Sequence, residues 1–101
     1  MYYGEAPSAF AFESITVAGT AIGPTAATIS PTGAPGAVRA TLTLETAQVR
    51  YRYDGTAPTA TEGHLLEVGD VLTLEGHVNI SRLLAIRTGG TSGVIKASYE
   101  R

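Results

Sequence analysis

The sequence contains no cysteine, so neither a disulfide framework nor a cysteine metal site can hold the chain together. Its stability must therefore come from packing. No run of about 18 consecutive apolar residues occurs, which argues against a membrane-spanning helix. The first residues also lack the basic segment and apolar run of a signal peptide, so we expect no secretory leader.

Charge is scarce as well. Charged residues make up 16 % of the chain, with one lysine against six arginines, and the net charge is −2. This balance leaves no basic footprint for nucleic acid or an anionic membrane, and we expect neither as a partner. A surface poor in lysine and relatively rich in threonine and arginine resembles a contact surface. Compositional bias from a GC-rich genome explains the same numbers equally well.

The apolar content of 44 % argues against disorder, and fourteen threonines and twelve glycines favour β structure with many turns. The clearest strand covers residues 47–53. There Val49, Tyr51 and Tyr53 alternate with Arg50 and Arg52, which is the period-2 pattern of a half-buried strand. The aspartate–glycine pair that follows favours a turn, because glycine tolerates a positive φ.

Shorter period-2 segments separated by glycine and proline recur along the rest of the chain. They predict strands at 10–18, 26–29, 38–45, 64–68, 71–75, 82–88 and 94–99, with Leu84 and Ile86 facing inward. No window of eleven or more residues keeps a helical apolar stripe, so we predict no substantial helix. The pattern is typical of an all-β fold: a single-domain antiparallel β-sandwich, Ig-like or jelly-roll-like, of seven to eight short strands. The sandwich is expected over residues 10–101, after an N-terminal arm or first edge segment at residues 1–9.

Signals for catalysis or metal binding are weak. His64 and His77 lie thirteen residues apart, and a shared metal site would need further ligands, of which Asp70 and Glu75 are the nearest. Two independent turn histidines are the better interpretation. The acidic residues fall at solvent-facing positions of a domain too small for a deep cleft, and no serine lies in a nucleophile motif. We therefore expect no enzyme, no catalytic residue, no metal site and no cofactor.

Two features are candidates for protein contacts. Arg50 and Arg52 share the exposed face of one strand, and Arg39 lies opposite them if the strands at 38–45 and 47–53 pair. The three would then form a docking stripe for an acidic partner; simple pairing with Glu45 or Glu75 is the alternative. Two tyrosines near the amino terminus offer anchors for an arm. The candidate interface residues are Tyr2, Tyr3, Arg39, Arg50 and Arg52.

Two resemblances appear around the central strand. Residues 51–59, Y-R-Y-D-G-T-A-P-T, resemble the Y-x-x-D-G-T-x-P-T signature of small Ig-like β modules such as the carboxy-terminal domain of chitobiase-type enzymes. Those modules are accessory, so this likeness implies a sandwich without catalysis. The longer series V-R-Y-R-Y-D-G-T-A-P-T, G-H-L-L-E-V-G-D-V-L-T-L-E-G, I-S-R-L-L-A-I-R-T-G and G-V-I-K-A-S-Y resembles small uncharacterised virion proteins of tailed bacteriophages and prophages. No functional residue is carried over from either.

The second resemblance implies a structural protein of the virion, assembled in the cytoplasm of the bacterial host. A capsid cement or decoration protein is the leading expectation, with the major capsid protein or other virion proteins as partners and a homo-oligomeric or multi-copy arrangement. The alternatives are a tail, head–tail connector or adsorption component, or an accessory carbohydrate-binding module. For the tail or adsorption component, the loops at 31–36 and 89–93 are candidate contact sites if they lie at the same end of the sandwich. Only the carbohydrate-binding module calls for a glycan ligand, bound through exposed tyrosines.

Overall fold

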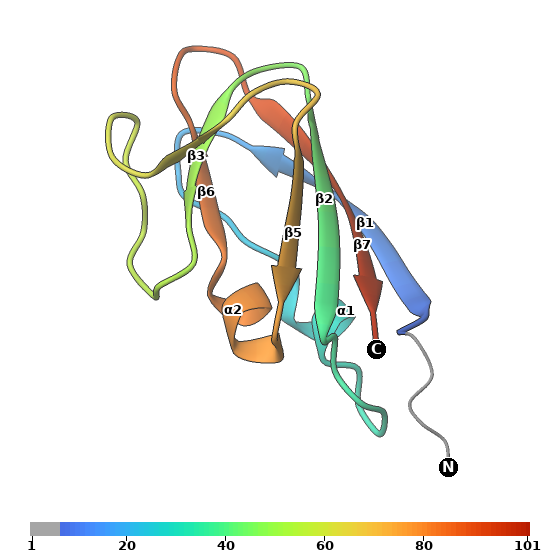
Figure 1. Cartoon of the computed structure of the whole chain (residues 1–101). Coiled ribbons are helices and arrows are strands. Elements are labelled where there is room, and N and C mark those ends of the chain that lie inside the picture. The colour runs from blue at the N-terminus through green and yellow to red at the C-terminus, as the bar shows by residue number, and fades with distance from the viewer. Residues whose placement is uncertain (1–6) are drawn as a thin grey trace.

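The computed structural model describes residues 7–101, so the predictions for Tyr2 and Tyr3 lie outside the described residues. The described chain folds into two antiparallel sheets that face each other, as Figure 1 shows. This arrangement confirms the expected all-β sandwich. Its seven strands are β1 (Ala9–Val17), β2 (Arg39–Glu45), β3 (Val49–Arg52), β4 (His64–Leu66), β5 (Val71–Glu75), β6 (Leu84–Arg87) and β7 (Gly93–Glu100).

The four-stranded sheet has the order β1-β7-β2-β5 and the three-stranded sheet the order β4-β3-β6. The chain crosses from one sheet to the other between β2 and β3, through a tight connection. There the Ala47 amide donates to the Glu45 carbonyl oxygen at 3.0 Å, and Thr46 takes a φ of 81°. A β-branched residue rarely adopts a positive φ, so this turn stores backbone strain.

The core lies between the sheets and follows the period-2 pattern. On β2 the residues Ala40, Leu42 and Leu44 are fully buried, while the residues between them are half-exposed. On β7 alternate residues from Ile95 to Tyr99 are buried in the same way. Burying one leucine side chain contributes about 1.5–3 kcal/mol, so these alternating strands supply most of the driving force for folding.

Two short helices stand where the sequence predicts none. The strand expected at 26–29 is wrong: Ala26–Ile29 forms α1, a single helical turn. Two alanines favour a helix, Pro31 prevents its extension, and only Ile29 needs burial. The second helix, α2 (His77–Arg82), follows the strand-ending Gly76 and buries Ile80. Neither helix exceeds six residues, so the absence of a substantial helix is confirmed for residues 7–101.

The inward face predicted for the strand at 82–88 is also wrong. In β6 the buried residue is Ala85, whereas Leu84 and Ile86 are half-exposed. The physical reason is its neighbour across the sheet: Ala85 pairs with Tyr51, and a small side chain leaves room for the tyrosine ring. Because α2 takes up residues 77–82, β6 also begins two residues later than expected.

Within residues 7–101, neither helix is long and apolar enough to cross a bilayer. The loop at 31–36 and the loop at 89–93 lie at opposite ends of the sandwich (Figure 1), because each precedes one of two antiparallel neighbours, β2 and β7. The condition under which the two loops would be candidates for one contact site is therefore not met. A binding tip made from both cannot exist on one copy of this chain.

Candidate functional site

The predicted arginine stripe is not assembled. Arg39 lies on β2 in the four-stranded sheet, whereas Arg50 and Arg52 lie on β3 in the three-stranded sheet. The strands carrying them do not pair, because the chain changes sheets between them. Arg39 instead contacts acidic neighbours across its own sheet, at 4.0 Å from Glu75 and 3.3 Å from Glu100. The cross-strand alternative therefore holds for Arg39, with Glu75 as one of its partners.

The two arginines of β3 are engaged with their own loop. Arg50 donates to the carbonyl oxygens of Ala60 at 3.2 Å and Gly63 at 2.7 Å, so it fastens the loop between β3 and β4. Arg52 forms a two-pronged ion pair with Asp54, with Nε–Oδ1 and Nη2–Oδ2 distances of 3.1 and 2.6 Å. Both side chains have found intramolecular partners, which weakens their case as a docking stripe for an acidic surface.

Two regions of the described chain are candidate binding surfaces. The first is the solvent-facing side of the four-stranded sheet, here called the outer face. At its centre are two rows of residues, and each row contains one residue from each of β1, β7, β2 and β5, paired directly across the sheet. The rows are Phe12–Ser98–Thr41–Thr73 and Ser14–Lys96–Thr43–Val71.

The two central rows of the outer face are mostly polar and carry one charged residue, Lys96. Seven of its eight central side chains are threonine, serine, valine or phenylalanine, and the eighth, Lys96, donates to the Ser14 hydroxyl at 2.8 Å. Hydroxyl groups are cheaper to desolvate than charges, and Arg39 at the border is already ion-paired. Phe12 stands out, with 61 % of its surface exposed. Such a face can be covered by a partner at low desolvation cost.

Both edges of this sheet are open in the part of the chain that the structure describes. No strand pairs with the outer side of β1 or of β5. Proteins usually protect long edges with lysine, proline or a strong bulge. The nine residues of β1 include neither lysine nor proline, and the only irregularity is a register shift near its start, between Ala9 and Ala11.

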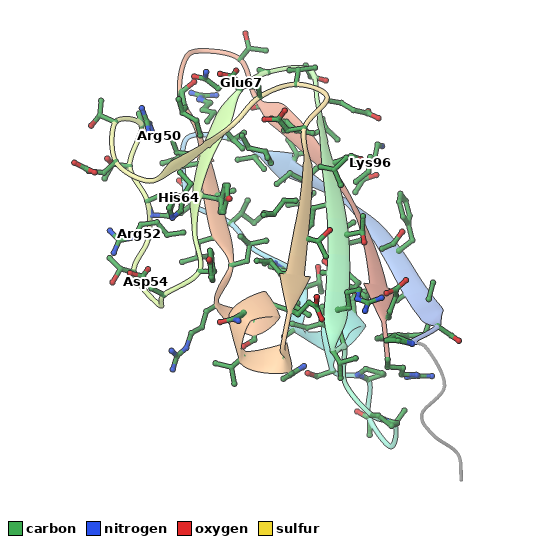
Figure 2. All side chains as sticks on the ribbon, viewed as in Figure 1. Arg50, Arg52, Asp54, His64, Glu67 and Lys96 are labelled. Carbon is green, nitrogen blue, oxygen red and sulfur yellow. The ribbon has the colours of Figure 1, made fainter. Side chains whose placement is uncertain are left out.

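The second region is a hollow at the end of β3, lined by Arg52, Tyr53, Asp54 and His64 and about 280 Å³ in volume. We call it the β3-end hollow. It forms because β4 begins only at His64, which pairs with Tyr51, so the last residues of β3 have no strand beside them on that side. Figure 2 shows Arg52, Asp54 and His64 together around this end of the sheet, remote from Lys96.

Aromatic rings and an ion pair set the chemistry of the hollow. Tyr51 and Tyr53 are stacked with ring centroids 6.3 Å apart, and the His64 ring lies 5.3 Å from that of Tyr51. The hydrogen bonds from Arg52 lower the pKa of Asp54 to about 2. Asp54 is therefore fully ionised near neutral pH, which makes it a hydrogen-bond acceptor and a poor proton donor.

The two histidines lie in unrelated places. His64 belongs to the β3-end hollow, whereas His77 opens α2 and fastens the loop at 31–36. Its Nδ1–H donates to the Ala37 carbonyl at 2.8 Å, and its Nε2 lies 3.1 Å from the Ser30 hydroxyl. Among residues 7–101 no three potential metal ligands come together.

A third polar cluster ties β1, β7 and α1 together. The fully buried Tyr99 donates its hydroxyl to Glu13 at 2.6 Å, and Thr25 donates both its hydroxyl and its amide to the same carboxylate. Burial opposes ionisation of Glu13, but these three hydrogen bonds outweigh it and lower its pKa. Burial, reinforced by Glu13, raises the pKa of Tyr99. The partners are all satisfied, so the cluster stabilises the fold.

Sequence reasoning named Arg52 as a candidate contact residue and used Tyr51 and Tyr53 only to predict a half-buried strand, so it missed the hollow that they help to form. The signal was partly available, because Tyr51 and Tyr53 alternate on one face next to a turn. Comparisons of the chain with known proteins found no matching family model, no matching curated protein and no matching solved structure. The function must therefore be inferred from the outer face and the β3-end hollow.

Proposed function

We propose that this chain is a non-enzymatic structural protein of a tailed-bacteriophage virion, most simply a cement or decoration protein that bridges capsid subunits. The observation that carries the proposal is the outer face, whose two central rows carry a single charged residue, with an open strand edge on either side. The sequence resemblance to virion proteins points the same way. The partner is then the capsid shell, and the chain resides in the particle.

The size of the outer face fits attachment by many weak contacts. Four strands about 4.8 Å apart, with about seven residues each at 3.3 Å, present roughly 450 Å². A stable pairwise interface buries about 800 Å² on each partner. One outer face alone therefore binds weakly, and a firm attachment requires several contacts per copy or many linked copies. Multivalency of that kind is how a small protein stabilises a large shell.

The open edges supply the additional contacts. An extended segment of a neighbouring copy or of a capsid subunit can add to β1 or β5 through main-chain hydrogen bonds. β1 is the better candidate because it is longer and its own Phe12 is exposed. A partner that pairs with β1 would cover this phenylalanine.

The test uses purified shells that lack the chain, to which the chain is added back. Restored resistance to heat and low salt supports the proposal, and shells that are equally robust without it contradict it. Thr41→Glu places a charge in the centre of the outer face and should abolish binding to the shell. Thr32→Glu, in the exposed loop at 31–36, is the matched control and should bind normally.

A tail, head–tail connector or adsorption role is the second candidate for a virion protein of this size. The opposite placement of the two glycine- and proline-rich loops removes the shared binding tip that this role would use. Copy number separates the two candidates: many copies over the shell indicate cement, and a few copies at one site indicate the tail. Quantitative mass spectrometry of intact particles measures it directly.

A further inference from the structure

The geometry points to a second, separate function: the β3-end hollow binds one neutral sugar unit of a surface glycan. This site is on the three-stranded sheet, so it can be occupied while the outer face of the other sheet is attached to a shell. The inference goes beyond the structural role proposed above and does not depend on it. A chain with both functions would hold glycan at the particle surface.

The size and shape of the β3-end hollow suit a small ligand. The hollow of about 280 Å³ is close to the lower limit of small-molecule sites, and it is open to solvent on one side. A second hollow, of about 330 Å³, shares Arg52, Asp54 and His64 and extends to Glu62. Together they suit a single ring with neighbours that project into solvent, as in an oligosaccharide.

The β3-end hollow also offers an aromatic surface, the ring of Tyr53. The C–H groups on one face of a pyranose ring are apolar and carry slight positive charge, which suits the negative face of an aromatic ring. Tyr53 is 39 % exposed and lines the hollow. Its ring is held by stacking on Tyr51 and by the nearby His64, at centroid distances of 6.3 Å in both cases. A ring fixed in advance loses little freedom when a ligand binds.

An ion pair between Arg52 and Asp54 lies beside the aromatic rings. Arg52 and Asp54 hold each other in place through two hydrogen bonds, yet each keeps further capacity: guanidinium N–H donors on one side and carboxylate lone pairs on the other. A sugar hydroxyl both donates and accepts, so neighbouring hydroxyls can bond to the pair. The ion pair keeps the donor and the acceptor next to each other, which suits a ligand that carries neighbouring hydroxyl groups.

The charge of the hollow selects a neutral ligand. Arg52 and Asp54 neutralise each other, and Glu62 adds a negative charge at the rim of the second hollow. That charge opposes phosphate and sulfate groups. A quaternary ammonium would gain from the rings and Glu62, but the Arg52 guanidinium opposes it. A neutral saccharide is repelled neither by Glu62 nor by the Arg52 guanidinium.

The experiment is a titration of the ¹⁵N-labelled chain followed by NMR. The probes are the methyl glycosides of glucose, galactose, mannose and N-acetylglucosamine, with choline and inorganic phosphate as charged competitors. We expect at least one glycoside to shift the amides of residues 52–54 and 62–64 saturably, with a Kd on the order of 1–10 mM, because one sugar offers few atoms to an open site. Choline and phosphate should bind more weakly.

Variants locate the binding. Tyr53→Ala should weaken it at least tenfold, whereas Tyr53→Phe keeps the ring and should stay within about threefold of the parent chain. Phe12→Ala removes an exposed aromatic from the outer face and should leave binding unchanged. The inference is overturned if no glycoside binds below about 50 mM, if the shifted amides lie elsewhere, if choline or phosphate binds more tightly, or if Tyr53→Ala binds like the parent while its spectrum remains folded.

Failure of the glycan-binding inference can be distinguished from failure of the proposed structural role. The titration uses the isolated chain and no particle, whereas shell binding is tested with Thr41→Glu on the other sheet. Tyr53→Phe keeps the test valid even if Tyr53→Ala fails to fold, because loss of binding in a folded Tyr53→Phe chain would also contradict a stacking role.

Discussion

Replacing Tyr99 by phenylalanine removes the hydroxyl with which this buried residue bonds to Glu13. The tyrosine has no exposed surface, and its hydroxyl lies 2.6 Å from a Glu13 carboxylate oxygen. A hydrogen bond to a charged group contributes about 1.5–3 kcal/mol. Because Thr25 still donates twice to Glu13 and water can reach this half-buried carboxylate, we take the lower end, about 1.5 kcal/mol. For a domain of this size that loss lowers Tm by about 6–12 °C.

The difference between the parent chain and Tyr99→Phe should depend on pH at both extremes. The folded-state pKa of Glu13 is lowered, so its contribution is present above the unfolded value of about 4.5 and is lost as the pH falls through the folded value. The pKa of Tyr99 is raised, so its contribution is complete below the unfolded value of about 10 and declines at higher pH. The stability gap should therefore be widest between pH 5 and 9.

Urea denaturation at a series of pH values measures the gap directly. Tyr53→Phe is the matched control: this tyrosine is exposed, and we expect its free energy of unfolding to change by less than about 0.5 kcal/mol at pH 7. The reasoning is refuted if Tyr99→Phe is as stable as the parent chain at pH 7, or if the gap stays constant down to pH 3.

Three further changes test other parts of the account. Thr46→Gly relieves the positive φ between β2 and β3 and should raise the free energy of unfolding by about 1 kcal/mol in urea; a loss would contradict the strain. Gly93→Ala should lower it by about 1–3 kcal/mol, since a Cβ there would lie 2.6 Å from a carbonyl oxygen of the β2–β3 connection; an unchanged midpoint would contradict this close approach. Arg50→Ala should speed amide exchange around Gly63, whereas the exposed Arg82→Ala should not; equal exchange in both would show that Arg50 does not fasten the loop.

The sequence specified the long strands well and the short elements poorly. Alternation over seven or more residues, as in β2, leaves one interpretation, because a shift by one residue would expose every leucine. The four residues Ala26–Ile29 carry too little periodicity to separate a strand from a helical turn. In β6 apolar residues on both faces concealed which face is buried, and the register that pairs Ala85 with Tyr51 shows it only in the structure.

The candidate site was less predictable because it depends on contacts between distant residues. Arg50 and Arg52 share a face by local geometry, and the sequence shows this. Whether Arg39 joins them depends on which sheet its strand enters, and one strained residue, Thr46, redirects the chain. His64 reaches the β3-end hollow only through the register that pairs it with Tyr51. No local pattern in the sequence sets that register.

The most direct test of the structural role is a density map of an intact particle that contains this chain. The account predicts many copies on the capsid, each with Thr41 and the rest of the outer face turned toward the shell and the β3-end hollow turned toward solvent. A map in which the chain is absent from the particle, or is attached through the hollow with its outer face exposed, would contradict it.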